Sequence, residues 1–122
     1  MKSILVIGTG SFIGGVFRYL LSLFIQTKTS SLFPLHTLTV NIVGCFLIGI
    51  CIGFFDKGQI SQEWKLFVTT GFLGGFTTFS AFSNETISLF KESQAGYALL
   101  YILASVLLGL LATYIAYWLV KH

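Results

Sequence analysis

One uncharged segment, from Leu66 to Asn84, combines glycines, hydroxyl side chains and aromatic rings in a pattern that could conduct a small ion. It is long enough to span a bilayer core, which takes ~20 residues. Its glycines loosen a helix, and its threonines are stiff at χ1 and carry hydroxyls. Irregular backbone at membrane depth must be buried in protein or line a watery cavity. We therefore expect a transmembrane helix that breaks near Gly74–Thr78 and frees backbone carbonyls for use.

Aromatic rings and hydroxyls share one helical face just after this expected break. Phe79 and Phe82 are three residues apart, and Ser83 follows Phe79 by four, so all three lie on the same side of a helix. A face that alternates aromatic edges with hydroxyls indicates the lining of a permeation path.

Other polar residues stand in or beside apolar stretches, and each has two interpretations. The Asn41 amide is costly in a membrane unless it is hydrogen-bonded, so it either joins helices or donates to a passing anion. Arg18 either extends to the interface or forms a vestibule cation that attracts an anion or pairs with Glu85. Glu85 is either an interfacial carboxylate or one that faces a vestibule. Ser105 is an interior hydroxyl, and most such groups bond their own helix.

The composition is that of an integral membrane protein. Of the 122 residues, 55% are hydrophobic and 9% are charged, and the mean hydropathy is +0.89. A soluble domain of this size does not need so much apolar surface. The net charge is +3, and the charges stand mostly at the ends of the apolar stretches. This distribution indicates anchoring at a lipid bilayer rather than binding to nucleic acid.

Four apolar stretches predict an all-α fold, a single domain of four transmembrane helices over residues 1–122. We expect the helices at 3–26, 35–55, 66–91 and 95–120, with the third broken near its middle. We expect the first to be a transmembrane helix rather than a cleaved signal peptide, since no convincing small-residue cleavage site follows it. Basic residues show only a slight bias between the two sides, so the chain could insert both ways and form an antiparallel dimer. The same bias also fits a single orientation with the termini inside. Four spans are few to enclose a pathway alone, and an oligomer is expected in either case.

The sequence offers little for catalysis. His36 and His122 stand apart from other metal ligands and near the interfaces. The glycine run at 71–75 lacks the Lys-Ser/Thr ending of a phosphate-binding loop. The spans also lack the central carboxylate that a proton-coupled exporter usually needs. We therefore expect a passive channel rather than an enzyme or a pump.

Three segments closely resemble the bacterial fluoride channel family, called Fluc or CrcB. They are Gly10–Tyr19, Thr37–Gly44 and Gly71–Ser83, and the third is highly specific. The similarity covers essentially the whole chain in order and spacing. It implies a dual-topology homodimer in the bacterial inner membrane, in which two antiparallel subunits form two pores. Fluoride would leave through these pores, relieving its toxicity.

The resemblance also assigns a pore lining, residue by residue. Phe79 and Phe82 match the phenylalanine box, whose electropositive ring edges can face an anion. Asn41 matches the pore amide. Ser80 and Ser83 match the hydroxyls of the same stretch.

A structural sodium ion is implied as well. Gly74 and Thr77 match the residues at the helix break whose backbone carbonyls hold Na⁺ on the dimer axis. Two carbonyls from each of two subunits would supply four oxygens. Arg18 matches the family arginine of the first span, and Glu85 the acidic residue after the box.

One position departs from the family pattern, and another leaves a polar track incomplete. Ala81 stands where many members carry Thr between the two phenylalanines, so one hydroxyl is missing. Gly109, one turn after Ser105, supplies no hydroxyl to a polar track in the fourth span.

Two rival functions stay open. A small multidrug exporter shares the four-span dual-topology design, but it would need a carboxylate in the first span, where this chain has Arg18. A non-transporting subunit of a membrane complex would explain the glycines but gives no reason for the run from Thr77 to Phe82.

Overall fold

The computed structural model describes residues 1–58 and 60–122, and this part of the chain is built of helices. In chain order the elements are α1 (Lys2–Lys28), α2 (Leu35–Asp56), α3 (Gln62–Lys65), the π-helix η1 (Leu66–Leu73), α4 (Gly74–Phe76), α5 (Phe79–Lys91) and α6 (Ala95–Lys121). Four helical stretches of the described chain are long and apolar enough to cross a membrane, the third running from Gln62 to Lys91. The prediction of four spans is confirmed.

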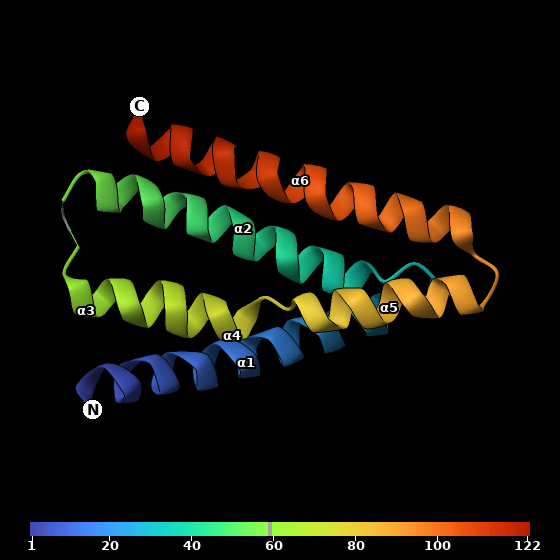
Figure 1. Cartoon of the computed structure of the whole chain (residues 1–122), viewed down its shortest axis with the longest axis horizontal. Coiled ribbons are helices and arrows are strands. Elements are labelled where there is room, and N and C mark those ends of the chain that lie inside the picture. The colour runs from blue at the N-terminus through green and yellow to red at the C-terminus, as the bar shows by residue number, and fades with distance from the viewer. Residues whose placement is uncertain (59) are drawn as a thin grey trace.

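The four spans lie side by side in an elongated bundle (Figure 1). α2 lies between α6 and the rod formed by α3, η1 and α4, and its most extensive contact is with α6. α1 packs chiefly on η1 and α4. Both termini lie at one end of the bundle, where α2 also meets α3.

Small residues allow α1 to cross η1 and α4 at very short range. A Cβ atom added at Gly10 would stand 2.6 Å from the Phe67 carbonyl oxygen and 2.9 Å from the Phe72 nitrogen. One added at Gly75 would stand 2.5 Å from the Ser11 carbonyl oxygen. Any side chain at these positions would push the two backbones apart. The first span is therefore held to the break region by backbone contact, as in other glycine-mediated membrane helix pairs.

The predicted break in the third span is confirmed, and it falls at two threonines. The helix stops at Phe76, and Thr77 and Thr78 are extended, with ψ of 159° and 118°. Helix resumes at Phe79, where the Thr78 hydroxyl accepts a hydrogen bond from the Ala81 N–H at 3.1 Å. The glycines before the break stay helical. Threonine ends the helix here because its side chain can cap the next one.

The segment before the break is not an α-helix. Leu66–Leu73 forms the π-helix η1, in which hydrogen bonds reach five residues along the chain instead of four. No residue type separates this geometry from an α-helix, and it was not predicted. Such segments are rare and frequently accompany functional sites.

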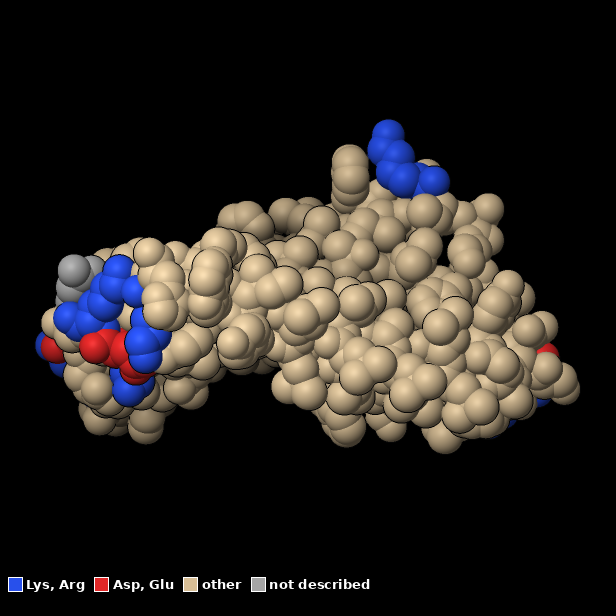
Figure 2. Space-filling view, turned by 90° about the horizontal axis from the view of Figure 1, so that it is seen from above, with Lys and Arg blue, Asp and Glu red and all other residues tan. Residues whose placement is uncertain are grey.

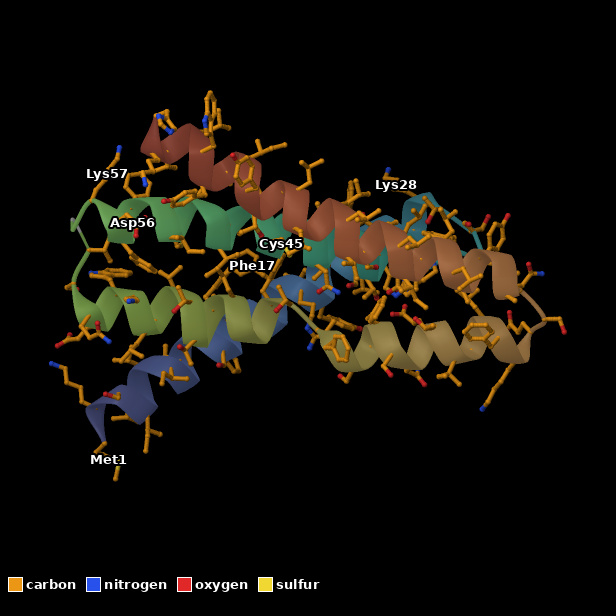
Figure 3. The ribbon with its side chains drawn as sticks, turned by 45° about the horizontal axis from the view of Figure 1, so that its top comes forward. Met1, Phe17, Lys28, Cys45, Asp56 and Lys57 are labelled. Atoms are coloured by element: carbon orange, nitrogen blue, oxygen red, sulfur yellow. The ribbon has the colours of Figure 1, made fainter. Side chains whose placement is uncertain are left out.

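The outer surface is apolar along the middle of the bundle and polar at its ends. Charged side chains gather at the end that holds the termini, and most of the remaining face is uncharged (Figure 2). Met1, Asp56 and Lys57 lie at that end and Lys28 toward the other (Figure 3). Because large apolar side chains stand exposed along every span, this surface must face lipid or another protein chain.

A candidate ion pathway beside the helix break

An open groove of about 450 Å³ runs beside the break, with walls from α2, η1, α4, α5 and α6. Six of the residues predicted to form the site line it: Asn41, Gly74, Thr77, Phe79, Phe82 and Ser105. Ser80 and Ser83 are exposed on α5 and lie outside this lining. The fold thus gathers a predicted amide, aromatic pair and hydroxyl from three different spans.

Asn41 fastens α2 to the break. Its Nδ2 donates to the Thr78 carbonyl at 3.1 Å, and the Thr78 N–H donates to its Oδ1 at 2.9 Å. Each partner satisfies a polar group that would otherwise be costly at membrane depth. An amide nitrogen has two N–H donors, so one N–H of Asn41 is not used in its bond to Thr78.

Two backbone carbonyls at the break lose their usual helical donors. In a continuous helix, the N–H of Thr78 would bond to Gly74 and that of Ala81 to Thr77. Thr78 instead donates to Asn41, and Ala81 donates to the Thr78 hydroxyl. The carbonyl oxygens of Gly74 and Thr77 are therefore among those that the break releases, and both residues line the groove.

Side-chain ligands for a metal are not gathered in the part of the chain that the structure describes. No group of three or more His, Cys, Asp or Glu residues there could hold a metal ion. Backbone carbonyls of unwound membrane helices can coordinate Na⁺, so the released carbonyls are a chemically suitable donor set.

The two predicted pore phenylalanines have different surroundings. Their ring centroids are 5.5 Å apart. Phe82 is held against the Tyr101 ring of α6, at 5.0 Å between centroids. Phe79 is 79% exposed. One ring is therefore fixed within the chain, and the other is left for a partner or lipid to cover.

Arg18 supports the break from the other side. Its Nε donates to the Gly75 carbonyl at 3.2 Å. That carbonyl too lies within four residues of the break, so its own helical donor is displaced. Arg18 does not pair with Glu85 in this structure, and the carboxylate of Glu85 has other partners.

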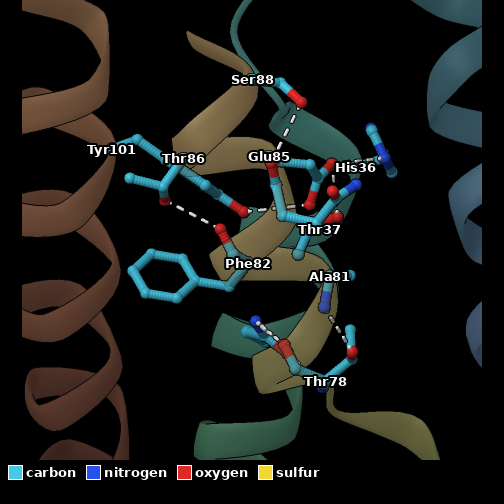
Figure 4. Close-up of polar contacts among 11 residues, drawn as sticks. His36, Thr37, Thr78, Ala81, Phe82, Glu85, Thr86, Ser88 and Tyr101 are labelled. Carbon is cyan, nitrogen blue, oxygen red and sulfur yellow. Dashed lines mark hydrogen bonds and ion pairs between the residues drawn. The ribbon is translucent and has the colours of Figure 1, made fainter. Parts of the chain in front are cut away.

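Glu85 is held by three side chains from two other helices (Figure 4). His36 Nε2 lies 3.0 Å from Oε2, the Thr37 hydroxyl donates to the same oxygen at 3.0 Å, and the Tyr101 hydroxyl donates to Oε1 at 3.4 Å. His36, predicted to stand apart, is thus a partner of Glu85. Because 49 residues separate the two positions in the numbering, spacing carried no signal for this contact.

Ser105 is unusual among the interior hydroxyls. Its Oγ is buried and has no hydrogen-bond partner in the described part of the chain, although the common expectation is a bond to its own helix. Because Ser105 lines the groove, this hydroxyl can donate to a bound ion.

Gly109, one turn after Ser105, lies where α6 packs against α2. A Cβ atom there would stand 3.2 Å from the Cys45 sulfur, a tight contact between α6 and α2 that would need the cysteine side chain to shift by a few tenths of an ångström.

Comparison with known proteins identifies the family. The family described as "CrcB-like protein, Camphor Resistance (CrcB)" matches residues 5–117. A protein of Flavobacterium psychrophilum is 47% identical over 115 residues, covering 93% of both chains. One of Phocaeicola vulgatus is 42% identical over 118 residues, covering 97% of this chain and 98% of its own. One of Thermus thermophilus is 42% identical over 113 residues, covering 93% and 89%. Each of the three is named fluoride-specific ion channel FluC. The chain belongs to the CrcB family.

Proposed function

We propose that this chain forms a passive, fluoride-selective channel that exports F⁻ across the bacterial inner membrane and relieves fluoride toxicity. The observation that carries the proposal is near-full-length identity, up to 47% over 115 residues, to proteins named fluoride-specific ion channels. The same observation counts against an exporter of larger compounds and against a purely structural subunit.

The chemistry of the groove supports selectivity for a small anion. Fluoride is strongly hydrated, so its dehydration must be offset by close donors. The second N–H of Asn41, the unpartnered hydroxyl of Ser105 and the ring edges of Phe79 and Phe82 are donors of that kind. Larger chloride would not fit the same spacing.

Charge supports passive conduction over pumping. The described lining of the groove contains no Lys, Arg, Asp or Glu. Without a fixed cation the ion is not trapped, and without a carboxylate there is no obvious protonation cycle. Glu85 belongs to a separate cavity at the end of the bundle.

We further propose that a second, antiparallel copy covers the groove. An ion path must be enclosed, yet the groove is open in the single chain and Phe79 is 79% exposed. Ser80 and Ser83, on the exposed side of α5, would then complete the lining. Gly74 and Thr77 carbonyls from both copies would hold a structural Na⁺ at the dimer centre.

The function is tested by efflux from liposomes that contain the purified protein, read with a fluoride electrode beside a chloride electrode. We expect rapid fluoride release and no chloride release. Release of neither ion, in liposomes with confirmed insertion, would contradict the proposed channel function. The two rival functions, a small multidrug exporter and a non-transporting subunit, would then be favoured again. Dual topology is tested separately, by tagging both termini and probing them from each side of the membrane.

A further inference from the structure

The groove beside the helix break contains a polar side chain that the proposed function leaves without a role, the thiol of Cys45. Cys45 belongs to the described lining of the groove. It follows Asn41 by four residues on α2, so the two side chains share one face of that helix and lie ~6 Å apart along its axis. Figure 3 shows Cys45 midway along the bundle, where α2 and α6 run side by side. On α2, the thiol is therefore the next polar side chain along this wall after the amide.

Opposite this thiol, α6 offers no side-chain donor of its own. Gly109 follows Ser105 by one turn and has no side chain, and a Cβ atom there would stand 3.2 Å from the Cys45 sulfur. The thiol thus lies beside the point where a side chain of α6 would begin. Thr113, one turn further on, does not fill the gap, because its hydroxyl contacts the carbonyl oxygens of Cys45 and Gly109 at 2.9 and 3.2 Å. At this level the donor between the two helices is the thiol of Cys45.

The threonine hydroxyls of the lining are already in use, whereas one serine hydroxyl is not. Thr69 and Thr77 each donate to the carbonyl four residues earlier, at 2.7 and 3.0 Å, and the Thr78 hydroxyl accepts the capping hydrogen bond at the start of α5. The Ser105 Oγ is buried and has no hydrogen-bond partner among the described residues. Because an unpaired buried hydroxyl is costly, it indicates a ligand in the groove beside it. That ligand would pass within one helical turn of the Cys45 thiol.

We propose that Cys45 is a further residue of the fluoride path, whose thiol donates to the ion one turn beyond Asn41 and Ser105. The inference rests on the proposed function, since it concerns the same flux through the same groove. A thiol is a weak donor on a small side chain, so it can contact fluoride without holding it as a fixed cation would. A hydrogen bond of ordinary net strength changes an equilibrium by about three- to tenfold. Loss of the thiol should slow efflux by that order.

The first experiment separates the donor from the space that the side chain fills. Cys45→Ala removes the donor, and Cys45→Ser replaces it with a hydroxyl. Measured as fluoride efflux per inserted channel, Cys45→Ala should be about three- to tenfold slower than the wild type, and Cys45→Ser should conduct at least as fast as the wild type. The matched control is Cys51→Ala, on the same helix but outside the described lining of the groove, which should keep wild-type efflux.

The second experiment uses methyl methanethiosulfonate, a small neutral reagent, to test whether the thiol faces the ion. The thiol gives its proton to the buffer, the thiolate attacks the methylthio sulfur, a mixed disulfide forms and methanesulfinate leaves. The product has no S–H donor and a bulkier side chain. In Cys51→Ala, where Cys45 is the one remaining cysteine, the reagent should abolish most of the fluoride efflux and dithiothreitol should restore it. In Cys45→Ser, where Cys51 remains, the reagent should leave efflux unchanged.

Several outcomes would overturn the proposal. Wild-type efflux in Cys45→Ala would show that the ion does not use the thiol, and equal slowing in Cys45→Ala and Cys45→Ser would show a packing role alone. Mass spectrometry reports whether Cys45 has reacted: unchanged efflux after complete modification, or no modification at all, would place the thiol away from the open path. Absence of fluoride release from the untreated wild-type protein would instead contradict the proposed function itself.

Discussion

Replacing Asn41 by Ala tests the link between the helix break and conduction. The change removes both hydrogen bonds to Thr78, at 3.1 and 2.9 Å. It also leaves the Thr78 N–H and carbonyl unpaired at the break, where no helical partner can replace the amide. Hydrogen bonds between membrane helices are worth about 0.6 kcal/mol on average and up to about 1.7 kcal/mol. We therefore expect Asn41→Ala to lower the free energy of unfolding by about 1–3 kcal/mol.

A matched control is needed, because any loss of stability could reduce flux. Thr113→Val removes one other bond between α6 and α2, in which the Thr113 hydroxyl donates to the Cys45 carbonyl at 2.9 Å. Thr113 does not belong to the described lining of the groove. This variant should lose a comparable amount of stability per bond and keep fluoride efflux close to wild type.

The assay pairs thermal unfolding in detergent with fluoride efflux per inserted channel. Asn41→Ala should unfold at lower temperature and lose most of its efflux, because the tie to the break and the spare N–H donor both disappear. Wild-type values for both readouts would refute the reasoning. Equal loss of efflux in Thr113→Val would show that flux reports general stability, and the role of Asn41 in the pathway would be rejected.

The remaining predictions concern the lining and the cation. Phe82→Ile should cut fluoride efflux sharply and leave the dimer intact on size-exclusion chromatography, because it removes the ring edge held against Tyr101; unchanged efflux would reject the pore assignment. Ser105→Ala should slow efflux without lowering the unfolding temperature, since its buried hydroxyl has no partner to lose in the described chain; a clear drop in unfolding temperature would instead indicate a structural bond. Exchanging Na⁺ for a large organic cation should destabilise the purified protein, because the carbonyls of Gly74 and Thr77 would lose their proposed ligand; identical melting curves in the two salts would count against the sodium site.

The class of the protein and the order of its spans followed from the sequence alone. Apolar length and the scarcity of charge decide membrane insertion segment by segment, so no tertiary contact is needed to predict four helices. The break near Thr77 was also predictable, because glycine and threonine weaken a membrane helix through local backbone and side-chain effects. Residues such as Phe79 and Phe82 could be singled out because helical spacing puts them on one face.

Only the tertiary structure decided which polar groups meet. The bonds from Asn41 to Thr78, from Arg18 to Gly75 and from His36 to Glu85 each join different spans. They depend on how the helices rotate and cross, and the close approach of α1 to the break is set by glycine contacts with backbone on another helix. Local periodicity specifies the face on which a side chain lies, and the packing of whole helices specifies what that face meets.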